Sequence, residues 1–124
     1  MFLIPRPWDQ CKTPILMVAR AYDPKFHGEA HWRDLGMLDM TMAVFEDLMT
    51  IDTEEEDRED KMAEMLKELE IYHTKGGVLA RPVVWRSADT VTPFVWWDQY
   101  GGNDMPTISP YMVYIQATTP NQTA

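Results

Sequence analysis

Two histidines provide the one arrangement in this sequence with the spacing of a metal site. His27 and His31 are four residues apart with Glu29 between them, and this spacing can place two imidazoles on one helix face. In the zinc-protease motif, however, a glutamate directly follows the first histidine. Gly28 occupies that position and weakens a helix. We therefore predict surface histidines, with no metal, no cofactor and no catalytic residue; an enzyme site built from these histidines and nearby carboxylates is an alternative.

Charge and composition argue against several other functions. The 124-residue chain has a formal net charge of −9 and 11 basic residues, which disfavours binding to the nucleic-acid backbone by this chain alone. No apolar run is long enough to span a membrane, and the apolar start at residues 1–4 is too short for a signal peptide. Cys11 is the single cysteine, which is compatible with a reducing compartment. We expect an intracellular protein.

Four aromatic residues are concentrated in residues 92–101. Thr92 can cap a helix, Pro93 suits its first position, and Gly101 can end it. Trp96 and Trp97 would then project about 100° apart, on different faces of the helix. Either other elements of the chain cover both faces, or one indole lies on the surface and can contact another protein. Tryptophan and tyrosine concentrate binding energy at interfaces, so we consider both a core and an interface. The predicted interface residues in this segment are Phe94, Trp96, Trp97 and Tyr100.

Helical periodicity also dominates the other segments. Patterns typical of β-strands are weak throughout the sequence. The chain length suits one domain, which is large enough to bury a hydrophobic core without disulfides. The ten methionines and five tryptophans favour adaptable cores or binding surfaces. We predict an all-α, compact single domain over residues 1–124, with five to seven short helices and at most a minor β element. Its expected parts are an irregular arm at 1–13, helices at 14–22 and 35–51, a helix that begins within the acidic run 52–60 and is closed by Gly76-Gly77, further helices at 82–89, 93–101 and from 106 onward, and a tail at 118–124.

The segment 35–51 carries apolar residues on two helix faces. Such a helix is normally sandwiched between other elements. We call the rows of apolar residues on these two faces the first and the second stripe. If the domain cannot cover both faces, the second stripe is the best candidate for a dimer interface. By contrast, the apolar residues of segment 62–73 fall on a single helix face. The acidic residues of segment 52–60 suit a solvated turn and the first turn of the next helix. The first stripe is Leu38, Met42, Phe45 and Met49, and the second is Met37, Met40, Val44, Leu48 and Ile51, of which the first four are predicted interface residues.

The order of several motifs resembles a known family. The block Pro93-x-x-Trp96-Trp97-x-x-Tyr100-Gly101, followed by Pro106-x-Ile108, resembles the C-terminal dimerisation region of hAT-family transposases, especially the plant branch. Similar pieces occur upstream in the same order. These pieces are Trp8, the segment from Pro14 to Asp23-Pro24-Lys25-Phe26, the turn Gly76-Gly77-Val78-Leu79, and Arg86.

The resemblance implies association without catalysis. In the family, two of the three catalytic acids lie upstream of this region. The family's zinc-containing BED module, which binds DNA, is absent from this sequence. A Glu-Arg block would follow the position of Ala124. Asp23 replaces a usual asparagine, and residues 118–120 replace a serine-rich turn. We expect a truncated, domesticated or remnant form that self- or hetero-associates through a Trp/Met-rich surface. The alternative is a regulatory or antagonist protein, of toxin–antidote or inhibitor type, that binds a specific host partner.

Overall fold

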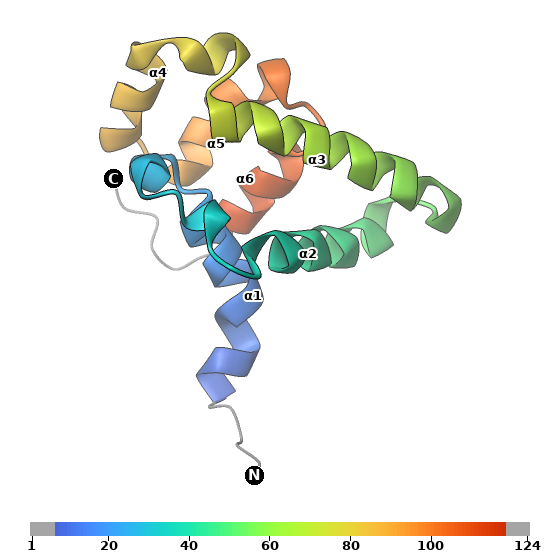
Figure 1. Cartoon of the computed structure of the whole chain (residues 1–124). Helices are drawn as coiled ribbons and strands as arrows, with labels where there is room; N and C mark the ends of the chain where they lie inside the picture. The colour runs from blue at the N-terminus through green and yellow to red at the C-terminus, as the bar shows by residue number, and fades with distance from the viewer. Residues whose placement is uncertain (1–6, 119–124) are drawn as a thin grey trace.

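Helices make up the fold in the computed structural model, which describes the backbone of residues 7–118 and the side chains of residues 14–118. Within these residues there are six α-helices, five 3-10 helices and no strand. The predicted all-α class is confirmed. The α-helices are α1 Pro7–Ala21, α2 Met37–Asp52, α3 Arg58–Thr74, α4 Pro82–Arg86, α5 Pro93–Asp104 and α6 Ser109–Ala117, and the 3-10 helices are η1 Pro24–Glu29, η2 His31–Arg33, η3 Glu55–Asp57, η4 Gly77–Ala80 and η5 Ser87–Asp89 (Figure 1).

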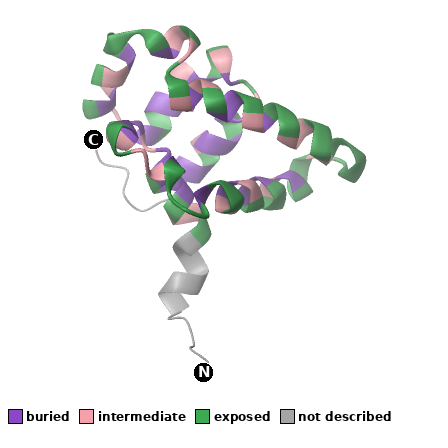
Figure 2. Cartoon of the chain, viewed as in Figure 1, coloured by how far each residue is buried: buried purple, intermediate pink, exposed green. Residues whose placement is uncertain are grey.

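The core lies between the inner faces of the longer helices. Helices α5 and α6 pack against each other, and α1 packs against α2 and α6. Helices α2 and α3 are joined through η3 at one end of the molecule, and α4 lies at the opposite end (Figure 1). Figure 2 shows the buried residues on the inward sides of these helices. Of the described helices, none is both long enough and apolar enough to cross a membrane.

Helix α5 begins as predicted but ends later. The Thr92 side chain accepts a hydrogen bond from the Val95 backbone N–H at 3.3 Å, and a proline occupies the first turn. The helix then continues through Gly101 to Asp104. A Cβ on Gly101 would lie 2.6 Å from Ser109 Oγ and 2.9 Å from a Trp97 ring atom. This glycine therefore permits close packing of α5 on α6 and does not end the helix.

Several other predicted boundaries also need correction. Residues 7–13, predicted as an irregular arm, are helical, and Pro14 lies inside α1; residues 1–6 and 119–124 lie outside the described residues. The prediction placed Pro14 at a helix start because threonine followed by proline is typical of a helix N-terminus, but the helix here continues through it. Helix α3 ends near the predicted glycines, although Lys75 itself takes the left-handed conformation, with φ of 57°. Helix α6 starts at Ser109, three residues after Pro106.

The buried face of α2 combines residues from both predicted stripes. Met37 and Val44 come from the second stripe, and Phe45 and Met49 from the first. Val44 and Phe45 are neighbours in sequence, so the covered face is a band centred between the two stripes. The outer members of the stripes, Leu38 and Ile51, are 48% and 83% exposed. The expectation that Met37 and Val44 form a dimer face is therefore corrected, because they are part of the core.

Candidate interaction groove and aromatic core

Both tryptophans of α5 lie inside the core. Trp96 and Trp97 are 0% exposed. Their indole N–H groups donate to backbone carbonyls of other elements, Trp96 to Val84 and Trp97 to Tyr22, each at 2.9 Å. The Tyr72 ring is stacked on Trp97, with ring centroids 5.1 Å apart. Because neither indole has surface left for a partner, the expectation that they form an interface is corrected for this fold.

The other predicted interface residues are dispersed over the molecule. Phe94 is 38% exposed on α5. Tyr100 is half-buried, and its hydroxyl accepts a hydrogen bond from Ser87 at 3.1 Å. Met40 and Leu48 are half-buried on α2. Among these four, Leu48 lines a groove.

His27 is a core residue, which corrects the prediction of a surface histidine. It is 9% exposed, its Nε2 lies 2.9 Å from the carbonyl oxygen of Tyr72, and its ring packs between Trp32 and Trp85 at centroid distances of 4.3 and 4.4 Å. His31 belongs to a separate 3-10 helix and contacts Glu29 at 2.9 Å. The two histidines share no helix face, because the chain turns between η1 and η2. Across the described residues, no group of three or more potential metal-binding side chains is close enough to hold an ion.

A second histidine joins the same aromatic cluster. The hydroxyl of Tyr22 lies 2.9 Å from Nε2 of His73, and the ring of Trp32 is stacked on His73 at a centroid distance of 5.0 Å. Burial lowers the pKa of His73 to about 4, against a smaller opposing effect of Glu70. Burial also lowers the pKa of His27. The cluster therefore holds both imidazoles in the neutral form near neutral pH.

This cluster should make stability depend on pH. In the unfolded chain His73 binds a proton near its ordinary pKa of 6.5, whereas in the folded chain it does so near 4. As pH falls from about 7 to 4 the unfolded state gains protons that the folded state excludes, so the free energy of unfolding should fall by about 3 kcal/mol from this residue. Urea unfolding at a series of pH values measures the effect. The His73→Gln variant should show a shallower decline.

His31→Gln is the matched control for this measurement, because it makes the same substitution at a partly exposed imidazole outside the aromatic cluster. A shallower decline in His73→Gln than in His31→Gln would assign the effect to the buried imidazole. If the free energy of unfolding depended on pH equally in wild type and in His73→Gln, the lowered pKa of His73 would be contradicted. Since His27 also has a lowered pKa, part of the decline should persist in His73→Gln.

An apolar groove lies between the C-terminal turns of α2 and helix α6. Its volume is about 270 Å³. Two large apolar residues in its lining are exposed, Ile51 by 83% and Tyr114 by 51%. The sequence pattern pointed to α2, through Leu48 and Ile51, but gave no signal that Tyr114 lies opposite them. The lining residues are Leu48, Ile51, Asp52, Pro110, Tyr111 and Tyr114.

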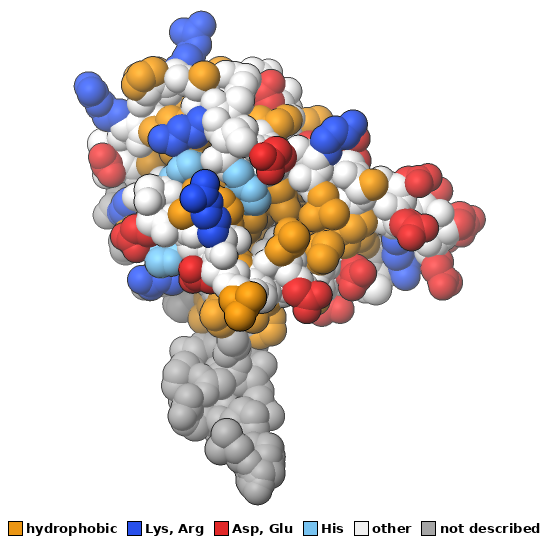
Figure 3. Space-filling view, in the orientation of Figure 1, with side chains coloured by type: hydrophobic (Ala, Val, Ile, Leu, Met, Phe, Trp, Pro, Cys, Tyr) orange, Lys and Arg blue, Asp and Glu red, His pale blue; other side chains and the backbone are white. Residues whose placement is uncertain are grey.

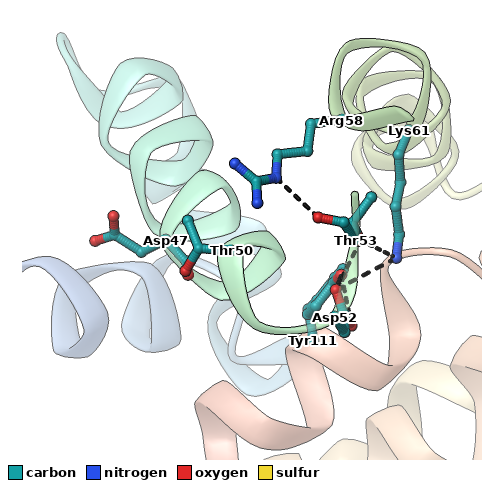
Figure 4. A network of polar contacts seen from close by, with 7 residues as sticks. All are labelled: Asp47, Thr50, Asp52, Thr53, Arg58, Lys61 and Tyr111. Carbon is teal, nitrogen blue, oxygen red and sulfur yellow. Dashed lines mark hydrogen bonds and ion pairs between the residues drawn. The ribbon is translucent and has the colours of Figure 1, made fainter. Parts of the chain in front are cut away.

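A polar network fixes one side of this groove (Figure 4). The Tyr111 hydroxyl donates to the Asp52 carboxylate at 2.7 Å, and Thr53 donates to the same group at 2.7 Å. Lys61 Nζ lies 3.7 Å from Asp52 and 5.0 Å from the centre of the Tyr111 ring. These hydrogen bonds, the one from Tyr111 foremost, lower the pKa of Asp52. The network ties α2, α3 and α6 together and keeps a negative charge at the rim of the groove.

Comparison of the chain with protein-family models, with curated proteins and with solved structures gives no significant match. The resemblance to the hAT dimerisation region therefore stays a prediction that rests on the order of its motifs.

Proposed function

We propose that this chain is a non-catalytic protein–protein association module that binds through the groove between α2 and α6. The exposure of Ile51 and Tyr114 carries this proposal. Both side chains are large and apolar over most of their surface, and they face one hollow beside the half-buried Leu48. Exposed apolar side chains that share one hollow are candidates for contact with another protein, and tyrosine is enriched among residues that dominate binding energy.

Two further observations support a binding role over a catalytic one. The two histidines with lowered pKa, His27 and His73, are each bonded to groups of the core. They are not among the residues that line the groove. In addition, the motif order that resembles the hAT dimerisation region favours association, with a second copy or with a different protein. A remnant of that region would keep a binding surface after losing any part in transposition.

Light scattering over a range of protein concentrations tests self-association. We would compare wild type with Ile51→Ser, and use Leu35→Ser as a matched control because Leu35 is fully exposed and precedes the opposite end of α2. If the groove binds a second copy, the wild type and Leu35→Ser should form dimers, and Ile51→Ser should be a folded monomer. Dimers that persist in Ile51→Ser would contradict the groove as the contact surface. Monomers throughout would leave a different protein as the occupant.

A further inference from the structure

Negative charge is concentrated at the end of the molecule that carries the groove. Residues 46–61 contain nine acidic and two basic residues, in a chain with a formal net charge of −9. Figure 3 shows acidic side chains gathered where α2 and α3 are joined. The exposed acidic residues of this end are Glu46, Asp47, Asp52, Glu54, Glu55, Glu56, Asp57, Glu59 and Asp60.

The two basic residues of this end are held in internal contacts. Arg58 Nε donates to the backbone carbonyl of Thr53 at 2.9 Å. Lys61 Nζ donates to the Thr53 hydroxyl at 3.0 Å and lies 3.7 Å from Asp52. Both cations therefore stabilise the turn between α2 and α3 (Figure 4). Most carboxylates around them remain directed to solvent and create a negative field at this end.

The acidic surface borders the apolar groove directly. Asp52 lines the groove, and the acidic run of 54–60 follows it in sequence. A second hollow, of about 500 Å³, lies between α2 and α3 and has methionines in its lining. The last turns of α2 thus separate an apolar groove from an acidic hollow. Residues that line this acidic hollow are Glu46, Asp47, Met49, Thr50, Glu55, Arg58, Glu59 and Met62.

We infer that the groove binds a basic segment of a different protein, in which aliphatic or aromatic anchor residues are flanked by lysine or arginine. This inference rests on the proposed function and names its partner. The anchors would contact Ile51 and Tyr114, and the flanking cations would face the carboxylates beside the groove. Charge complementarity of this kind accelerates association and selects among partners.

The same charge distribution disfavours a second copy as the occupant. A symmetric dimer uses the same patch on both subunits. Contact through the groove would therefore bring two acidic ends together, and like charges across an interface oppose association. A basic segment of another protein relieves this repulsion.

A random library of short peptides displayed on yeast tests the inference without assuming a sequence. The library would be selected for binding to wild type and to Leu35→Ser, and then depleted of peptides that also bind Ile51→Ser. We expect the remaining peptides to combine lysine or arginine with aliphatic or aromatic residues. A synthetic copy of one such peptide should bind Ile51→Ser roughly tenfold more weakly than wild type in fluorescence anisotropy, as for loss of an interface anchor.

The contribution of charge is tested with the same synthetic peptide. The combined variant Glu54→Gln, Glu55→Gln and Glu56→Gln leaves the groove intact and removes three exposed charges. Its affinity for the peptide should fall several-fold at low salt, and the difference from wild type should shrink as salt is added. Peptides without basic residues, or equal affinity for the glutamine variant, would overturn the inference about the partner's charge.

Two outcomes separate this inference from the proposed function. If no peptide depends on Ile51 but the light-scattering mass shows dimers that Ile51→Ser abolishes, a second copy occupies the groove. The inference is then wrong and the association module stands. If neither peptide binding nor self-association depends on Ile51, both are overturned. Circular dichroism of each variant confirms that the fold is retained.

Discussion

Replacing Trp97 with alanine should reduce the free energy of unfolding by about 4 kcal/mol, the range observed when a large buried aromatic is removed from a core. The indole is 0% exposed, stacks on Tyr72 and donates to the Tyr22 carbonyl across 75 positions of sequence. The substitution would therefore leave a cavity and an unpaired carbonyl where α5 meets the end of α1. A domain of this size has roughly 5–15 kcal/mol of total stability, so the variant should be marginal.

Urea unfolding followed by circular dichroism measures this loss. Phe94→Ala is the matched control, because it truncates an aromatic on the same helix that is 38% exposed, and it should cost about 1 kcal/mol or less. A Trp97→Ala variant as stable as Phe94→Ala would contradict the buried placement. A change in oligomeric mass in Trp97→Ala would report lost structure and would not locate an interface.

Replacing Glu68 with alanine should destabilise the fold by about 3 kcal/mol, because it leaves two backbone N–H groups without their charged acceptor. Glu68 is 2% exposed. Its Oε1 accepts from the backbone N–H of Thr107 at 2.8 Å and of Ile108 at 2.9 Å. These bonds hold the turn that leads into α6 and so set the position of Tyr111 and Tyr114 in the groove.

Glu68→Gln should cost about half as much as Glu68→Ala, because the amide oxygen can still accept while its charge is lost. Glu64→Ala, an exposed residue of the same helix that pairs with Lys67 at 3.3 Å, should change stability by less than about 0.5 kcal/mol. Urea unfolding ranks the three variants, and hydrogen exchange at Thr107 and Ile108 reports the turn directly. Equal stability of Glu68→Ala and Glu64→Ala would show that the buried carboxylate does not support α6.

Local features of this fold follow from the sequence where one segment contains the information. The cap at Thr92 and the proline after it place the start of α5 correctly, because capping uses atoms within one turn. The single stripe over residues 62–73 matches the buried Met65, Leu69 and Tyr72 of α3. The all-α class follows in the same way, because helical periodicity is repeated along the chain.

The role of a residue was less predictable from the sequence where a neighbouring element of the fold decides it. Gly101 has the properties of a helix end, but the approach of Ser109 makes it a packing residue inside α5. Glu68 appears in sequence as one more acid on a charged helix, yet it is buried because the turn before α6 supplies two donors. In each case the decisive partner belongs to a different element of the fold.

The sequence by itself determined the helices and their apolar faces, because hydrogen bonding and side-chain periodicity within a helix are local. Only the tertiary structure decided which of those faces are covered. In the folded chain Trp96, Trp97 and His27 are buried and pack against Tyr72. Ile51 and Tyr114, which belong to different helices, line the same groove. Periodicity shows that a face is apolar, but burial also depends on which distant helix packs against it, and that is set by the packing of the whole chain.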